Sequence, residues 1–133
     1  MNYLEKEIDS TLAQQKIKSK KFSAHDVSEL TSKLTSLFFS SKAKNMDPYF
    51  LKNTQKKHDP EYWKTVNTLE NFEKPTLIVQ DDHIHAWRLE TTEDLRTLLF
   101  ESTGFPFWIT PENLNTLIYL DDHDCVHLAQ RGP

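Results

Sequence analysis

The chain has 133 residues, of which 37% are hydrophobic, and it carries a net charge of −4 with two glycines and one cysteine. Its length fits one domain, and the scarcity of glycine excludes the glycine-rich phosphate loops of P-loop and dinucleotide-binding proteins. The lone Cys125 excludes an internal disulfide framework, which indicates a reducing compartment.

The chain shows neither a secretory signal nor a membrane span. Its first ten residues, MNYLEKEIDS, carry charges where a signal peptide needs an apolar run. No stretch approaches the roughly 18 apolar residues that a membrane span requires. We therefore expect a cytoplasmic protein without membrane contact.

Charge is divided unequally along the chain. Residues 1–74 hold 13 Lys against 10 acidic residues, whereas residues 75–133 hold three Arg against 10 acidic residues. This asymmetry has two interpretations: chance combined with the preference of lysine for helices, or an acidic face turned toward a basic partner. An acidic chain lacks the electrostatic footprint for phosphates, so direct nucleic-acid binding is not expected.

Helical periodicity dominates the first part of the chain. Two apolar stripes predict helices over residues 3–18 and 24–39, the second capped by Ser23. The stripes consist of Leu4, Ile8, Leu12 and Ile17, and of Val27, Leu30, Leu34, Leu37 and Phe38.

Residues 40–58 are polar and predict a long lysine-rich connection. Asp59-Pro60-Glu61 then supplies an N-cap, a proline at the first helical position and an acid in the first turn. A third helix is therefore predicted, ending before Pro75.

The periodicity changes after Pro75. Short β-rich runs predict strands at residues 76–80, 85–89, 107–110, 117–120 and 126–129. Between the second and third of these strands, Thr91 caps a predicted helix that ends at Gly104. The order predicts a single α+β domain over residues 1–133, with a helical part over 1–74 and a sheet part over 75–133. In it, N-terminal helices pack on one face of a C-terminal antiparallel sheet with one inserted helix.

One pattern stands out from the composition. Residues 76–83 read TLIVQDDH and residues 116–123 read TLIYLDDH, identical at six of eight positions. Each copy is a predicted strand that runs into an acidic turn, and a second histidine follows each turn, His85 or His127. The pattern predicts two similarly built hairpins in one sheet.

The two turns have three interpretations. They are plain turns in which Asp bonds to its own backbone, or a divalent metal site, or an acidic surface that binds and steers a cationic partner. The surface would comprise Asp81, Asp82, His83, His85, Asp121, Asp122, His123 and Asp124. We take the partner-binding surface as the site, and assign no metal, cofactor or catalytic residue.

Other residues give weaker signals. Cys125 and His127 share a face of their strand, but the neighbouring carboxylates disfavour a reactive thiolate, so a buried structural cysteine is expected. Tyr62 and Trp63 are adjacent on the third predicted helix and cannot both point into one core. One of them is therefore a candidate exposed anchor for a partner.

The stretch GFPFWITPENLNTLIYLDDHDCVHLA, residues 104–129, resembles the C-terminal hairpin of small bacterial proteins encoded beside toxin genes. The resemblance lies in two aromatic or aliphatic strands followed by an acidic turn with histidine. The matching positions are Phe107, Trp108, Ile109, Leu117, Ile118, Tyr119, Asp122, His123 and Asp124. The chain as a whole is similar to immunity proteins of contact-dependent growth-inhibition and related polymorphic toxin systems in size, acidity and lack of catalytic motifs.

The resemblance implies a non-enzymatic protein that neutralises a cognate toxin by occluding its active site. An acidic inhibitor suits a basic toxin, and a nuclease is one option. The alternative hypothesis is a metal-binding or metal-dependent hydrolase domain built on the two Asp-Asp-His turns. A third hypothesis is an adaptor or oligomerisation module that uses the amphipathic helix over residues 24–39.

Overall fold

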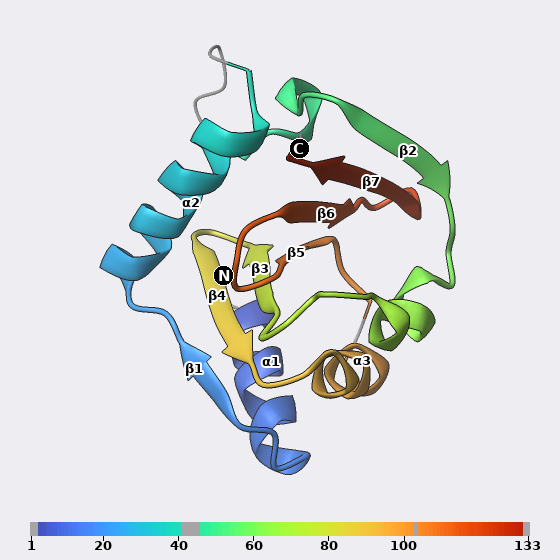
Figure 1. Cartoon of the computed structure of the whole chain (residues 1–133). Helices are drawn as coiled ribbons and strands as arrows, with labels where there is room; N and C mark the ends of the chain where they lie inside the picture. The colour runs from blue at the N-terminus through green and yellow to red at the C-terminus, as the bar shows by residue number, and fades with distance from the viewer. Residues whose placement is uncertain (1–2, 41–45, 103, 132–133) are drawn as a thin grey trace.

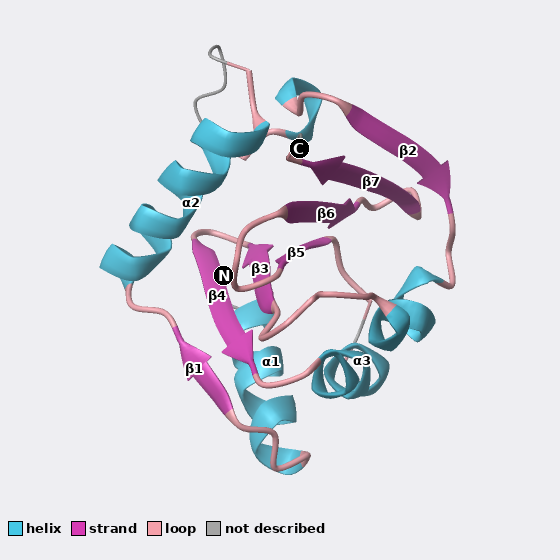
Figure 2. Ribbon diagram, in the orientation of Figure 1, coloured by secondary structure: helices cyan, strands magenta, loops and turns pink. Residues whose placement is uncertain are grey.

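The computed structural model describes residues 3–40, 46–102 and 104–131. It confirms the α+β class: these residues build a seven-stranded antiparallel sheet with helices around it (Figures 1 and 2). The helices are α1 (Tyr3–Gln14), α2 (Ala24–Phe38) and α3 (Thr92–Glu101), and the short 3-10 helices are η1 (Pro48–Phe50) and η2 (Tyr62–Thr68). The strands are β1 (Ser19–Lys21), β2 (Thr54–His58), β3 (Thr76–Gln80), β4 (Ile84–Leu89), β5 (Phe107–Thr110), β6 (Thr116–Leu120) and β7 (Cys125–Gln130).

The strands are ordered β1-β4-β3-β5-β6-β7-β2 across the sheet. The five central strands come from the predicted sheet part of the chain, and all five were anticipated in the sequence. Both edge strands come from the part predicted to be purely helical and connecting. Helices therefore lie mostly in the N-terminal part and strands in the C-terminal part, with two exceptions at the edges.

Helices cover both faces of the sheet, so the expectation of a single covered face is wrong. On one face, Leu77 and Val79 of β3 join a core with α1, η2 and α3. On the other face, Ile78 of β3 joins a second core with α2. The reason lies in β3 itself, in which four consecutive residues, 76–79, are buried. A continuous apolar run is typical of a strand buried on both sides.

The helix α2 begins and ends where its pattern indicates. Ser23 caps it by accepting a hydrogen bond from the Asp26 amide at 3.1 Å. The stripe residues Val27, Leu30, Leu34 and Phe38 are buried against the sheet. Because this apolar face is used inside the chain, it offers no surface for the adaptor or oligomerisation hypothesis.

The helix α1 ends at Gln14, four residues before its predicted end. Lys16 adopts a left-handed backbone with φ 55°. The Ile17 amide donates to the Leu12 carbonyl at 3.0 Å and the Lys16 amide to the Ala13 carbonyl at 3.2 Å. These two bonds form a Schellman C-cap, in which lysine occupies the position that glycine favours.

This cap gives a testable stability effect. Glycine adopts a left-handed backbone without the Cβ clash that a lysine suffers. We expect Lys16→Gly to raise the free energy of unfolding by about 0.5–1 kcal/mol in a urea titration. Ala13→Gly, placed inside α1, is the matched control and should lower it by a similar amount. A loss of stability for both variants would contradict the cap.

The edge strands β1 and β2 have no apolar alternation for a sequence pattern to detect. All three residues of β1 and all five of β2 are exposed. The segment 40–58 is thus not only a connection, because β2 pairs along its whole length with β7. Lys20 and Lys21 on one edge and Lys56 and Lys57 on the other discourage pairing with further chains.

Two further helices differ from their predictions, the third in its type and the fourth in its end. The third predicted helix is the 3-10 helix η2, because β-branched residues disfavour the α form and threonine hydroxyls bond carbonyls three residues back. Thr65 Oγ1 donates to the Tyr62 carbonyl at 3.1 Å and Thr68 Oγ1 to the Thr65 carbonyl at 2.6 Å. The helix α3 begins after Thr91 as predicted, but its C-cap is Ser102 rather than Gly104.

Candidate functional site

The two predicted hairpins are present, and their turns lie at the same end of the sheet. Both β3 and β6 are antiparallel to β5, which lies between them, so they run in the same direction. Residues 81–83 follow the end of β3, and residues 121–124 follow the end of β6. The twist of the sheet turns β6 well away from β3, and the two turns diverge in Figure 1.

The repeated sequences face opposite sides of the sheet. In the register, Ile78 aligns with Trp108, which aligns with Tyr119, so the second copy is shifted by one residue relative to the first. A one-residue shift reverses the face of every side chain. Leu77 consequently lies in the core beneath α1, and Leu117, its equivalent, lies in the core beneath α2.

In the second hairpin, Asp121 organises the turn. Its Oδ1 accepts hydrogen bonds from the His123 and Cys125 amides, both at 2.9 Å, and its Oδ2 lies 2.8 Å from His127 Nε2. Both side chains are 15% exposed. Burial raises the pKa of the Asp121 carboxyl, but the His127 ring and the two amides lower it by more, so it stands below its ordinary value.

In the first hairpin, Asp81 plays the same part on the other face. Its Oδ1 accepts from the His83 amide at 3.1 Å and lies 2.9 Å from His85 Nε2. The His85 Nδ1 lies 3.5 Å from Glu5 Oε2 at the start of α1. Burial raises the pKa of the Asp81 carboxyl, but the His83 amide, the His85 ring and the Glu5 amide outweigh burial and place it below its ordinary value.

The predicted site residues therefore divide into two groups. Two partly buried Asp–His pairs lie on opposite faces of the sheet: Asp81 with His85, and Asp121 with His127. The exposed members, which can meet a partner, are Asp82, His83, Asp122, His123 and Asp124.

Among the described residues, these side chains do not gather into a group of three metal-ligand types. In residues 3–40, 46–102 and 104–131, no three His, Cys, Asp or Glu side chains are placed so as to hold a metal ion. The metal hypothesis required ligands from both turns to meet at one point, and the described residues do not place them so. Cys125, expected to be buried, is only partly buried, and its Sγ lies 3.8 Å from the His123 carbonyl oxygen.

A pocket of about 440 Å³ opens beside the second turn. Its wall is aromatic, with side chains from η2, α3 and the segment leading into β5, and its rim is acidic. The lining includes Trp63, Phe100, Phe105, Phe107, Asp121, Asp122 and Asp124. We call it the aromatic–acidic pocket. It brings three predicted site residues together with Trp63, one of the two candidate anchors.

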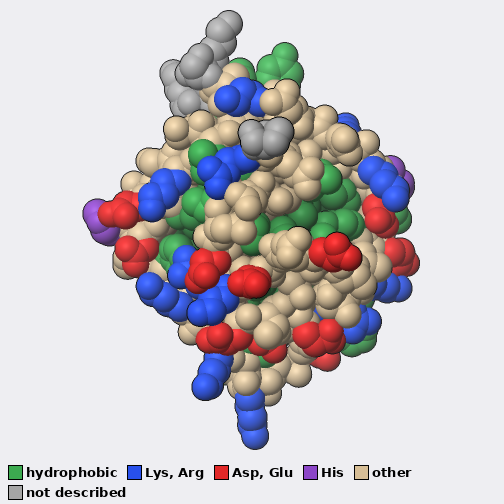
Figure 3. Space-filling view, viewed as in Figure 1, with side chains coloured by type: hydrophobic (Ala, Val, Ile, Leu, Met, Phe, Trp, Pro, Cys, Tyr) green, Lys and Arg blue, Asp and Glu red, His purple; other side chains and the backbone are tan. Residues whose placement is uncertain are grey.

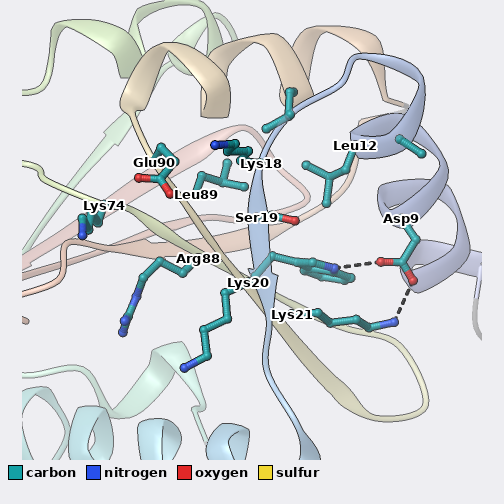
Figure 4. A pocket seen from close by; sticks show the side chains of 13 residues that line it. Asp9, Leu12, Lys18, Ser19, Lys20, Lys21, Lys74, Arg88, Leu89 and Glu90 are labelled. Carbon is teal, nitrogen blue, oxygen red and sulfur yellow. Dashed lines mark hydrogen bonds and ion pairs between the residues drawn. The ribbon is translucent and has the colours of Figure 1, made fainter.

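A second hollow, of about 730 Å³, lies beside β1 and has the opposite charge character. Lys20 and Arg88 stand directly across from each other on paired strands, and Lys18 and Lys74 also line the hollow. Asp9 accepts hydrogen bonds from Lys21 Nζ at 2.7 Å and from the Trp87 indole at 2.9 Å. Figure 4 shows Lys21 reaching Asp9 at the side of this hollow. The contact thus joins α1, β1 and β4 at the side of the hollow.

Charged side chains of both signs are interspersed over the lower part of the face shown in Figure 3, while apolar side chains emerge in its middle. The lysine-rich first part and the acid-rich second part of the sequence do not form two separate hemispheres on this face. No helix in the described part of the chain has the length and apolar character needed to span a bilayer.

Sequence reasoning missed most of the aromatic wall. Phe100 follows the apolar stripe of α3, and it is 62% exposed. Leu95, Leu98 and Leu99 already fill the buried side of α3. A fourth large apolar residue after that stripe was the signal that one of them would face outward.

No protein-family model matches the chain, and a comparison with curated proteins finds no match.

Proposed function

We propose that the protein binds a basic polypeptide and neutralises it, in the manner of the immunity proteins of polymorphic toxin systems. The observation that carries this proposal is the aromatic–acidic pocket, where the exposed Phe100 ring and the partly buried Trp63 ring lie beside the exposed carboxylates of the second turn. Large aromatic side chains within a charged rim are typical of the centres of protein interfaces.

The exposed aromatic residues supply the apolar part of such an interface. Phe100 is 62% exposed, and its ring centroid lies 5.6 Å from that of Trp63, which is partly buried. Covering these rings removes apolar surface from water, and each buried Å² contributes about 25 cal/mol. The two rings therefore act as anchors.

The acidic turns supply the steering part. Asp82 and Asp122 project from the same end of the sheet, and Asp122 is 74% exposed. Exposed carboxylates accelerate the encounter with a cationic surface and disfavour wrong partners. The mechanism is steric and electrostatic: the bound protein covers the basic active site of its partner, and no bond is made or broken.

The paired carboxylates serve the surface indirectly. Asp81 and Asp121 tie down their turns through backbone amides and a histidine ring. The neighbouring Asp82 and Asp122 are thus presented from ordered turns, which lowers the entropy lost on association.

Charge reversal tests this surface. The chain is co-expressed with the product of the adjacent upstream gene, and growth rescue and the dissociation constant of any complex are measured. Asp122→Lys should weaken the complex about 10- to 100-fold at low salt, because repulsion replaces attraction. The effect should shrink as salt rises, since exposed charges are screened.

Glu112→Lys is the matched control. Glu112 is exposed in the turn between β5 and β6, at the other end of the sheet. Its replacement by lysine changes the net charge of the protein by the same amount as Asp122→Lys. It should leave rescue and affinity unchanged. Equal rescue by wild type and Asp122→Lys, or equal weakening by both variants, would remove the proposed surface.

A further inference from the structure

We infer that the aromatic–acidic pocket takes an arginine side chain of the partner. The partner's identity rests on the proposed function, whereas the preference for a guanidinium group follows from the pocket itself.

The wall offers one exposed ring, Phe100, beside the partly buried rings of Trp63 and Phe105. Trp63 and Phe100 are inclined by 53° to each other, and Phe105 meets Phe107 edge-on with ring centroids 6.3 Å apart. Phe107 is buried and fixes this side of the wall. The Trp63 ring already attracts a cation of its own chain, since Lys64 Nζ lies 5.5 Å from its centroid.

The rim offers a carboxylate without an internal partner. Asp121 is committed to its own turn, and Asp122 lies 3.6 Å from His123. The exposed Asp124 carboxylate has no hydrogen-bond or ion-pair partner among the residues that the structure describes. The rim can therefore accept hydrogen bonds from a ligand without breaking any bond of Asp124.

The backbone at Asp124 adds a second observation. Its φ is 62°, in the left-handed region that favours glycine or asparagine. Its amide donates to the Asp121 carbonyl and its carbonyl accepts from the Asp59 amide, so the conformation is fixed from both sides. The Asp124 carboxylate is thus carried by a fixed backbone at the pocket rim.

Arginine is the side chain that satisfies both parts. Its guanidinium is planar and weakly hydrated, stacks on aromatic faces and donates in a fork that matches a carboxylate. The lysine ammonium is strongly hydrated and carries no flat face. The volume of about 440 Å³ accommodates the arginine side chain together with part of the backbone that bears it.

The probe is Nα-acetyl-arginine methylamide, titrated into the full chain and followed by NMR at the Trp63 indole and at the amides of residues 121–124. We expect saturable shifts with a millimolar dissociation constant. The matched lysine compound should bind about fivefold more weakly. No saturable shift at these resonances, or equal binding of the two compounds, would overturn the inference.

Three variants refine the test. Asp124→Asn keeps a residue that tolerates the left-handed backbone and removes the charge, so it should weaken the arginine probe about fivefold. Phe100→Ala removes a largely exposed ring, so the fold persists while binding weakens. Glu112→Gln removes a remote charge and should change nothing. Unchanged binding in Asp124→Asn would exclude the rim carboxylate.

The two proposals fail in different ways. If the complex forms and growth is rescued while the arginine probe does not bind, the anchor is wrong and neutralisation stands. If the probe binds with the expected variant effects and no rescue occurs, the arginine site stands and neutralisation is wrong.

Discussion

Replacing Trp87 by alanine should lower the free energy of unfolding by about 3–5 kcal/mol, the range for large aromatic residues truncated in a core. Trp87 is fully buried in β4, beneath α1. Its indole Nε1 donates to Asp9 Oδ1 at 2.9 Å, and Asp9 Oδ2 pairs with Lys21 Nζ at 2.7 Å. The substitution therefore leaves a cavity and removes the hydrogen bond that joins β4 to α1.

Urea unfolding followed by far-UV circular dichroism measures this loss. Trp87→Phe fills most of the cavity and removes the indole donor, so it should cost about 1–2 kcal/mol. Asp9 keeps Lys21 as a partner in that variant, which limits the penalty. A loss below about 1 kcal/mol for Trp87→Ala would show that the contact among α1, β1 and β4 does not support the fold.

Periodicity predicted the elements that bury a clear face. The helix α2 and the capped start of α3 follow from Ser23 and Thr91 together with leucine stripes. The strands β3 to β7 follow from short apolar runs between turn residues. In each case the same residues decide both local structure and packing, so a local pattern suffices.

The elements that sequence missed are stabilised by partners distant in the chain. Thr54–His58 has five exposed residues and is a strand only because β7 offers its backbone. Ser19–Lys21 similarly depends on β4. No propensity of the segments themselves carries that information.

The candidate site was predicted only in part. The acidic turns were visible as a repeat, but the one-residue shift between β3 and β6 could not be read from two nearly identical sequences. That shift sends His85 and His127 to opposite faces and separates the Asp–His pairs. The aromatic wall likewise depends on the packing of η2 against α3, which brings Trp63 to Phe100.

Removing the Asp121 carboxylate should be the most costly change in either turn. Its two oxygens accept from two amides and contact the His127 ring, and the side chain is 15% exposed. Asp121→Ala leaves the His123 and Cys125 amides and the ring without this acceptor, so we expect a loss of about 3 kcal/mol at neutral pH. Thermal or urea unfolding measures it.

The same carboxylate makes stability depend on acid. The pKa of Asp121 lies below its ordinary value of 3.8, because the His127 ring and the two amides outweigh the opposing effect of burial. A group with a lowered folded-state pKa contributes stability above its unfolded value, and that contribution is lost as the pH falls through the folded-state value. Wild-type stability should therefore decrease below a pH of about 4.

Asp121→Asn isolates this effect, since its amide oxygen can still accept from the two amides while the charge is gone. It should flatten part of the acid dependence, and Asp81 should retain the rest because the pKa of its carboxyl is also lowered. The matched control is Asp122→Asn, which removes the adjacent charge from a side chain that is 74% exposed. That control should stay within about 0.5 kcal/mol of wild type. If Asp121→Asn shows the same acid profile as wild type and Asp122→Asn, the Asp121–His127 pair is not what orders the turn beside the aromatic–acidic pocket.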